Sequence, residues 1–129
     1  MIIVVFGYTE NLEGEMVTVC AVKTGERLLI ERAVKTFDPD GTFITVYGTG
    51  DLEQRIIDVM PHVVWLEADA ENFSLAAKLK DAADINYIFI ADDTAKAFDA
   101  LSLKASGYIL RPVTEESAAK ELTQLRFPV

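Results

Sequence analysis

Short runs of consecutive apolar residues recur along the chain and predict β-strands. Within each run the apolar positions are continuous rather than alternating, which is expected of strands buried on both faces of a parallel sheet. A turn-forming segment, Asp38–Gly41, precedes one of them. The predicted strands are Ile2–Phe6, Met16–Val22, Phe43–Tyr47, His62–Leu66, Tyr87–Ala91 and Tyr108–Leu110.

Amphipathic stretches lie between these runs and predict helices. In one of them Leu29, Ala33 and Val34 fall near one face, and charged residues occupy the rest of the surface. Asp51 opens the next stretch, and Thr114 is placed to cap the last one. The predicted helices are Glu26–Phe37, Asp51–Met60, Phe73–Ala83, Thr94–Ala105 and a segment that begins after Thr114.

Strand and helix alternate five times from Met16 to Leu125. With right-handed crossovers, this alternation predicts an α/β fold, a three-layer α/β/α sandwich around a parallel five-stranded sheet. A chain of 129 residues, half of them hydrophobic, has enough apolar material for one core. We therefore expect one domain over residues 1–129. The run Ile2–Phe6 exceeds the alternation, so residues 1–15 are expected to add a strand and a turn.

The charge and the rare residues exclude several classes of function. The formal net charge is −9 and the sequence pI is about 4.5, so the chain repels the backbone of nucleic acids and should make no direct contact with them. Cys20 and His62 are the single cysteine and the single histidine, which excludes an internal disulfide and a cysteine-based zinc site. The apolar start is too short for a signal peptide or a membrane span. We expect a soluble, cytoplasmic protein without membrane contact.

Candidate chemistry lies where the strands end, because ligands of open parallel sheets bind beyond the carboxyl ends of the strands. Glu67 follows the run HVVWL and Arg111 follows YIL, so the two are expected to form a partly buried ion pair. The alternative is that both are merely solvated strand ends. The sequence has no GxGxxG motif, Walker lysine or GxSxG motif. The edge is expected to hold Gly7–Thr9 or Ala21–Thr24, Gly48–Gly50, Glu67–Asp69, Ala91–Asp93, Arg111 and Pro112.

The segment from Phe43 to Val129 resembles the receiver domain of bacterial two-component response regulators. The resemblance is carried by a helix that leads through ASGY to a short strand and then to a basic residue before a proline. It implies the flavodoxin-like strand order 2-1-3-4-5. It also places Glu67 at the phosphate-accepting aspartate, Ala91 at the switch threonine or serine, Tyr108 at the aromatic switch, and Arg111 with Pro112 at the family's lysine–proline pair.

The chain departs from this family where the metal would bind. Receivers carry an acidic pair after the first strand, and none follows either Ile2–Phe6 or Met16–Val22; spacing to the next helix favours Met16–Val22 as the first strand. Magnesium requires carboxylate oxygens, and besides Glu67 only Asp69 remains as a fallback ligand. We therefore expect no metal site and no cofactor. A permanent pair between Glu67 and Arg111 is expected in place of the metal–phosphate cluster.

The resemblance then implies a non-catalytic pseudo-receiver, a signalling domain that is not phosphorylated in the usual way. Residues 125–129 are similar to the start of a linker that leads to a DNA-binding or transcriptional activator domain, so control of transcription is expected. A second copy or another protein is expected to bind the face formed by Thr94–Ala105 and Thr114–Leu125. A histidine kinase is a further expected partner.

Two alternative functions stay open. Glu67 or Asp69 could accept a phosphoryl group, which would make the chain a functional receiver with an altered site. The fold is also shared with flavodoxin-like cofactor binders, although the segment Gly7–Glu10 is a poor phosphate loop.

Several conspicuous side chains have ordinary structural interpretations. Trp65 and Cys20 fall in predicted strands and are expected to fill the core. His62 follows a proline and is expected in a surface loop. Asp92 and Asp93 are expected to cap the start of a helix.

Overall fold

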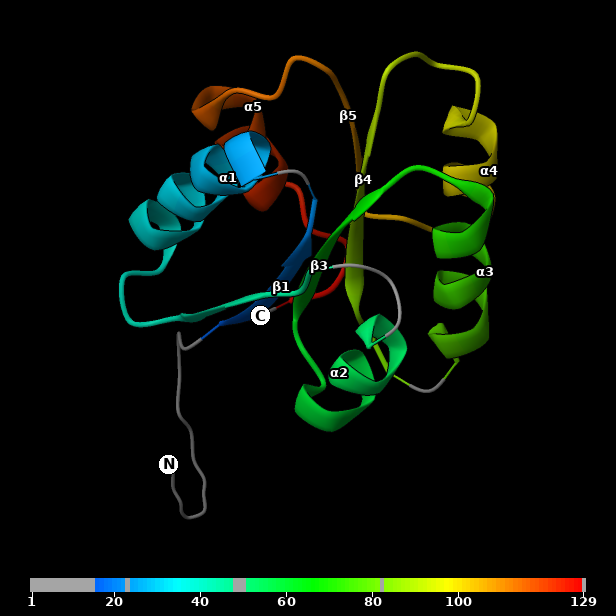
Figure 1. Cartoon of the computed structure of the whole chain (residues 1–129), viewed down its shortest axis with the longest axis horizontal. Helices are drawn as coiled ribbons and strands as arrows, with labels where there is room; N and C mark the ends of the chain where they lie inside the picture. Colours follow the sequence, from blue (N-terminus) through cyan, green and yellow to red (C-terminus); the bar gives the residue numbers. More distant parts are fainter. Residues whose placement is uncertain (1–15, 23, 48–50, 82, 129) are drawn as a thin grey trace.

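A computed structural model of the chain describes residues 16–22, 24–47, 51–81 and 83–128, in which strands and helices alternate (Figure 1). The strands are β1 (Val17–Ala21), β2 (Thr42–Thr45), β3 (Val63–Glu67), β4 (Asn86–Ala91) and β5 (Gly107–Leu110). The helices are α1 (Thr24–Phe37), α2 (Leu52–Val59), α3 (Ala70–Leu79), α4 (Ala97–Ser102) and α5 (Glu115–Leu122).

The strands form one parallel sheet in the order β2-β1-β3-β4-β5. This order confirms the predicted fold. It also identifies β1, rather than the run Ile2–Phe6, as the first of the five alternating strands. The register places Glu67 beside Ile90 and Ala91 beside Leu110. The carboxyl ends of β3, β4 and β5 therefore meet at one edge of the sheet.

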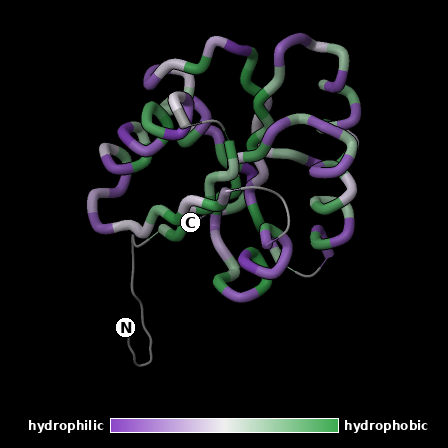
Figure 2. The backbone as a smooth tube through the Cα atoms, in the orientation of Figure 1, coloured by the Kyte–Doolittle hydropathy of each residue, from purple (hydrophilic) through white to green (hydrophobic). Residues whose placement is uncertain are grey.

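Helices cover both faces of the sheet and complete the three layers (Figure 1). On one face α1 packs against α5, and their buried residues, such as Ile30 and Leu122, join Trp65 of the sheet in one core. On the other face α2, α3 and α4 contribute to a second core that contains Ile56 and Phe89. The strands are among the most hydrophobic parts of the trace (Figure 2). Burial on both faces explains their continuous apolar runs.

Helix ends follow capping chemistry more closely than hydrophobic periodicity. The α3 helix begins at Ala70, earlier than the predicted Phe73, because the Asp69 carboxylate accepts a hydrogen bond of 2.8 Å from the Asn72 N–H. The α5 helix begins after Thr114, as predicted, and the Thr114 hydroxyl accepts from the N–H of the third helical residue at 2.9 Å.

The predicted helix over Thr94–Ala105 is wrong at both ends, since α4 spans Ala97–Ser102. The Asp93 carboxylate accepts a hydrogen bond of 2.9 Å from the Ala95 N–H, which closes a turn where the first helical turn was expected. Lys104 has a φ of 58° and so lies in the left-handed region, beyond the helix end. Asp92 and Asp93 therefore precede this turn and do not cap α4.

Trp65 and Cys20 are fully buried, as predicted. Burial raises the pKa of the Cys20 thiol to about 12, so the reactive thiolate does not form near neutral pH. His62 lies in a bend after α2, but it is partly buried rather than exposed. Its Nδ1 accepts a hydrogen bond of 2.9 Å from the Val17 N–H and so satisfies the first amide of β1.

The predicted strand Ile2–Phe6 lies outside the described residues, as do the expected edge segments Gly7–Thr9 and Gly48–Gly50. The alternative phosphate loop Gly7–Glu10 lies outside them too. Within the part of the chain that is described, no helix has both the length and the apolar character needed to cross a bilayer.

Candidate functional site

Arg111 and Glu67 form a bidentate ion pair at the carboxyl edge of the sheet. Arg111 follows β5 and Glu67 ends β3. Arg111 Nη1 donates to Glu67 Oε2 at 2.7 Å, and Nη2 donates to Glu67 Oε1. The side chain of Arg111 is 13% exposed and that of Glu67 is 33% exposed, so the pair is shielded in part from solvent. The planar guanidinium suits this two-point contact better than a lysine ammonium would.

A second carboxylate, that of Glu26 in the first turn of α1, binds the same guanidinium. Arg111 Nε donates to Glu26 Oε2 at 2.6 Å, and Nη2 donates to Glu26 Oε1 at 3.1 Å. The Glu26 side chain is 16% exposed. The hydrogen bonds that Arg111 donates to Glu67 and then to Glu26 raise the pKa of Arg111 above its ordinary value, so the residue stays charged.

Asp92, directly after β4, makes a third and weaker contact. Its Oδ1 accepts from Arg111 Nη1 at 3.2 Å, and its side chain is 80% exposed, so water screens this contact strongly. Arg111 therefore ties together α1, β3 and the loop after β4. We call Arg111, Glu26, Glu67 and Asp92 the Arg111 cluster.

Glu26 was missed because the candidate residues were taken only from strand ends and the loops directly after them. In a parallel α/β fold, the first turn of the helix after each strand reaches the same edge as the strand end. Glu26 lies in the first turn after β1, and this position is the signal that could have identified it.

The carboxylates of the Arg111 cluster do not fit a magnesium ion. Both oxygens of Glu67 and both oxygens of Glu26 accept hydrogen bonds from the guanidinium. The positive charge of Arg111 therefore occupies the place where a magnesium ion would need these oxygens as ligands. Across residues 16–128, as far as they are described, no group of three or more His, Cys, Asp or Glu side chains is arranged to hold a metal ion. Asp69, the predicted fallback ligand, caps α3 instead.

Of the remaining predicted site residues, Asp69, Ala91 and Tyr108 line a hollow of about 180 Å³ together with Glu67, and Pro112 is not part of its lining. Ala91, the last residue of β4, is 5% exposed and offers a methyl group where a hydroxyl would donate a hydrogen bond. Tyr108 of β5 donates from its hydroxyl to the Asp93 carbonyl at 2.8 Å, which fixes the loop after β4. Pro112 follows Arg111 through a cis peptide bond.

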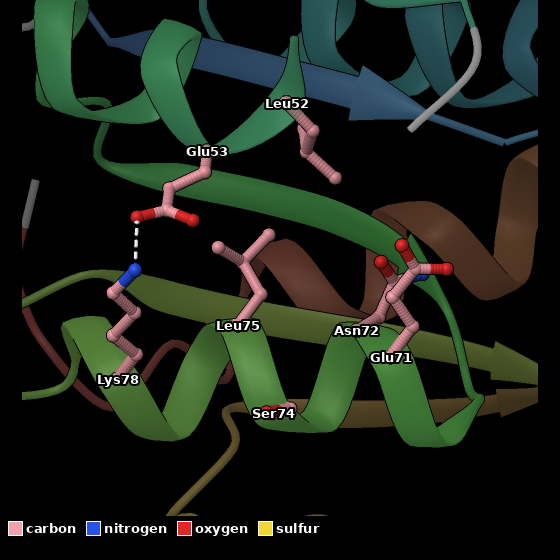
Figure 3. A pocket seen from close by; sticks show the side chains of 7 residues that line it. All are labelled: Leu52, Glu53, Glu71, Asn72, Ser74, Leu75 and Lys78. Atoms are coloured by element: carbon pink, nitrogen blue, oxygen red, sulfur yellow. Dashed lines mark ion pairs between the residues drawn. The ribbon is translucent and has the colours of Figure 1, made fainter. Parts of the chain in front are cut away.

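A larger hollow of about 370 Å³ lies between α2 and α3 (Figure 3). Lys78 of α3 pairs with Glu53 of α2 at 2.7 Å across one end, and Leu75 lies between the ends. At the other end the Asn72 side chain donates to the Glu67 carbonyl at 2.9 Å. Its lining contains none of the predicted site residues, and its ion pair is largely exposed.

No family model and no curated protein matches the sequence. Among solved structures, the response regulatory domain of mrkE from Klebsiella pneumoniae is similar, with a TM-score of 0.71, 19% identity, and coverage of 85% of this chain and 94% of that one. The receiver domain of the DNA-binding response regulator merR from Colwellia psychrerythraea 34H also has a TM-score of 0.71, with 17% identity and coverage of 85% and 97%. The chain has a receiver fold.

A LuxR-family DNA-binding response regulator from Staphylococcus aureus shares the receiver fold at a TM-score of 0.65 and 16% identity, with 84% of this chain and 96% of that one covered. At identities this low, the structural similarity establishes the architecture only, and the chemistry of the site has to be argued from its own residues. Within the receiver fold, Glu67, Ala91, Tyr108 and Arg111 gather at one edge.

Proposed function

We propose that the chain is a non-catalytic, receiver-like signalling domain whose edge is held permanently by the Arg111 cluster. The single observation that carries this proposal is the guanidinium bound by both oxygens of Glu67 and both oxygens of Glu26. A phosphoryl group on Glu67 would have to displace this cation from the carboxylate. The domain then acts by protein–protein contact in one fixed conformation.

The neighbouring residues support the same proposal. A phosphoryl group carries a charge of roughly −1.5 to −2, which needs a counter-ion and hydroxyl donors to hold it. Ala91 supplies no hydroxyl, and Asp92 and Asp93 surround the hollow with further negative charge. The lining also contains one cation, Lys96, whose side chain is exposed to solvent.

Incubation with acetyl phosphate and magnesium, followed by intact mass spectrometry, tests the proposal. The expected result is no phosphoryl mass gain, while a receiver domain that retains its aspartate gains one under the same conditions. A mass gain that disappears in Glu67→Gln or in Asp69→Asn would overturn the proposal and establish a phospho-accepting receiver.

We further propose that the partner face is the surface formed by Thr94–Ala105 and Thr114–Leu125, with a second copy of the chain as the partner. Large apolar side chains are exposed on and next to α4, with Phe98 77% and Leu101 68% exposed. Leu110 of β5 adds a third, at 45%. Phe98 and Leu101 are three residues apart on α4 and so share one face of the helix, and exposed apolar side chains grouped in this way are typical of protein interaction sites.

Sedimentation velocity tests this face. Phe98→Asp is expected to shift the chain from dimer to monomer, and Leu28→Asp on α1, where Leu28 is 49% exposed, serves as the matched control that leaves the dimer intact. A monomeric unsubstituted chain, or equal effects of both variants, would contradict a homodimer through this surface. A monomer that binds a histidine kinase through Phe98 would assign the face to that partner instead.

Transcription control through a DNA-binding domain joined after residues 125–129 completes the proposal. Its support is that two similar structures belong to DNA-binding response regulators. The net charge of −9 is consistent with DNA contacts being made elsewhere. Fluorescence anisotropy with duplex DNA is expected to show no binding by this chain alone at physiological salt, and binding here would contradict the division of roles.

A further inference from the structure

The sheet has a lateral edge at β2, where no other described strand covers the backbone. β2 pairs with β1 on one side and is the last described strand at that end of the sheet. The N–H groups of Thr42 and Val46 donate to carbonyl groups directly before β1 and within β1, at 2.8 Å and 3.0 Å. In a parallel ladder the alternate residues point the other way, so the N–H and C=O groups of Phe43 and Thr45 face outward from the sheet.

The side chains of β2 are covered less well than those of the central strands. Whereas β4 is buried along its whole length, β2 is exposed at Thr42 and only partly buried over its next three residues. Phe43 packs against the core on the α1 side and Ile44 against the core on the other face, each with apolar surface left uncovered. Phe37, which ends α1 before β2, is 44% exposed, and Tyr47, shortly after β2, is 75% exposed. An added strand would therefore cover apolar surface on both faces.

The chain enters β1 next to this edge. Met16, directly before β1, donates from its N–H to the Asp38 carboxylate at 2.6 Å, and its carbonyl accepts from Thr42, the first residue of β2, at 2.8 Å. The residues that precede Met16 are therefore joined to the sheet beside the start of β2. A strand placed outside β2 lies two strand spacings from β1, about 10 Å, whereas nine extended residues span up to about 30 Å.

The segment Ile2–Phe6, which lies outside the described residues, has the composition of a buried strand. Four β-branched residues and one phenylalanine follow one another without a charge or a proline. Nine residues, Gly7–Glu15, connect it to Met16. Because a parallel crossover needs a dozen or more residues, this connection favours a strand antiparallel to β1 and β2. β1 has a neighbour on each side and β5 lies at the far end of the sheet, which leaves the edge of β2.

We propose that Ile2–Phe6 docks as a sixth strand on the outer edge of β2, antiparallel to it. Its backbone pairs with the outward N–H and C=O groups of Phe43 and Thr45. Alternate side chains of the segment fall on opposite faces of the sheet, so both faces gain apolar cover. The added strand also closes an edge that would otherwise be open to pairing with other chains. The proposal uses no residue of the Arg111 cluster and does not rest on the proposed signalling role.

Hydrogen exchange of single amides, followed by NMR on the full chain, tests the proposal. We call the amides of Phe43 and Thr45 the outward amides, and those of Thr42 and Val46 the reference amides. The outward amides are expected to exchange at least about a hundredfold more slowly than an unstructured peptide, because pairing with Ile2–Phe6 closes the edge. The reference amides are protected whether or not the edge is covered, since they are bonded on the β1 side.

The double variant Ile3→Pro with Val4→Pro removes two consecutive N–H groups, one of which faces β2 in either register. In this variant the outward amides are expected to exchange within about threefold of the peptide rate, while the reference amides keep their protection. Asn11→Pro, in the connection to Met16, is the matched control and is expected to leave all four amides as they are in the unsubstituted chain.

Nuclear Overhauser contacts in the unsubstituted chain supply a measurement that does not depend on the folding of any variant. Contacts between the outward amides and the protons of Ile2–Phe6 are expected, and their absence would overturn the proposal. Outward amides that exchange at the peptide rate, or that stay protected in the double proline variant, would also overturn it. Protection that depends on chain concentration would assign the edge to a second copy and overturn docking by the chain's own segment.

Discussion

At the scale of single residues, the guanidinium of Arg111 binds the partly buried carboxylates of Glu26 and Glu67. Removing the guanidinium would leave both carboxylates without a counter-charge. Arg111→Met is therefore expected to lower the free energy of unfolding by about 2 kcal/mol, less than for a fully buried pair because water reaches Glu67. Adding Glu26→Gln and Glu67→Gln to this variant is expected to recover at least half of the loss. Urea denaturation measures the free energy of unfolding of the unsubstituted chain, of Arg111→Met and of the triple variant.

A double-mutant cycle between Glu67→Gln and Arg111→Met isolates the pair itself. A coupling of about 1 kcal/mol or more is expected for a bidentate contact of this exposure. Additive effects of the two substitutions would contradict the Glu67–Arg111 pair as an energetic contact. Asp92→Asn, at the exposed contact, is the matched control and should change stability little.

His62 provides a pH-dependent contribution to stability. Burial lowers its pKa below the ordinary value of 6.5, and its Nδ1 must remain unprotonated to accept from the Val17 N–H. Well above pH 6.5 both the folded and the unfolded chain carry neutral histidine, so the full contribution is present. As the pH falls below 6.5 the unfolded chain binds a proton first, and the stability decreases.

His62→Asn supplies the control, because the asparagine Oδ1 can take the place of Nδ1 without titrating. The unsubstituted chain is expected to lose stability relative to His62→Asn between pH 6.5 and pH 5, as measured by urea denaturation at each pH. Parallel pH profiles for the two proteins would contradict a role for His62 protonation.

Sequence reasoning placed Glu67, Arg111 and Asp92 at this edge of the sheet and missed Glu26, and the reason is geometric. Glu67 and Arg111 each end a strand, and the ends of neighbouring parallel strands must converge, so their meeting was predictable. Glu26 lies one helical turn farther along the chain, where its approach to Arg111 depends on how α1 packs on the sheet. The roles of Ala91 and Tyr108 stay predictions.

At the scale of elements, strand positions could be predicted because two-sided burial leaves an unbroken apolar signal. Helix ends were predicted only in part, because single hydrogen bonds decide them. The start of α5 after Thr114 was predicted from its cap, whereas the starts of α3 and α4 were not. Asp69 extends α3 by its cap, and Asp93 shortens α4 by closing a turn on Ala95. Both residues are aspartates before a helical stretch, and periodicity does not distinguish the two outcomes.

Two glycines illustrate how local packing fixes an element. At Gly41, before β2, an added Cβ would lie 2.8 Å from the Met16 carbonyl oxygen, whereas at Gly25 in α1 it would meet nothing within 4 Å. Gly41→Ala is expected to lower the free energy of unfolding by about 2 kcal/mol. Gly25→Ala is expected to raise it by about 0.5 kcal/mol, because alanine favours the helix. Thermal denaturation of the pair checks both signs, and loss of stability in Gly25→Ala would contradict an open surface there.

At the scale of the whole molecule, the two edges of the sheet are held differently. The carboxyl edge is held by charge, through an arginine that joins α1, β3 and the loop after β4. The amino edge is held by neutral hydrogen bonds centred on Asn86. Salt is expected to weaken the first edge more than the second, because partly exposed ion pairs are screened and buried amide contacts are not.

Asn86 links segments that are far apart in the sequence. Its amide donates to the His62 carbonyl at 2.9 Å and to the Phe127 carbonyl at 3.0 Å, and its oxygen accepts from Ser106 and from the Phe127 N–H. Every hydrogen-bonding position of the side chain is therefore used. The chain after α5 is in this way tied to the start of β4.

Asn86→Asp replaces both donors with a charged oxygen that faces two carbonyl groups. It is expected to lower the free energy of unfolding by about 3 kcal/mol, whereas Ser106→Ala, which removes one partner, is expected to lower it by about 1 kcal/mol. Hydrogen exchange at the Phe127 amide is expected to be protected in the unsubstituted chain and faster in both variants. Exchange at the rate of an unstructured peptide without any substitution would mean that Asn86 does not hold the segment after α5.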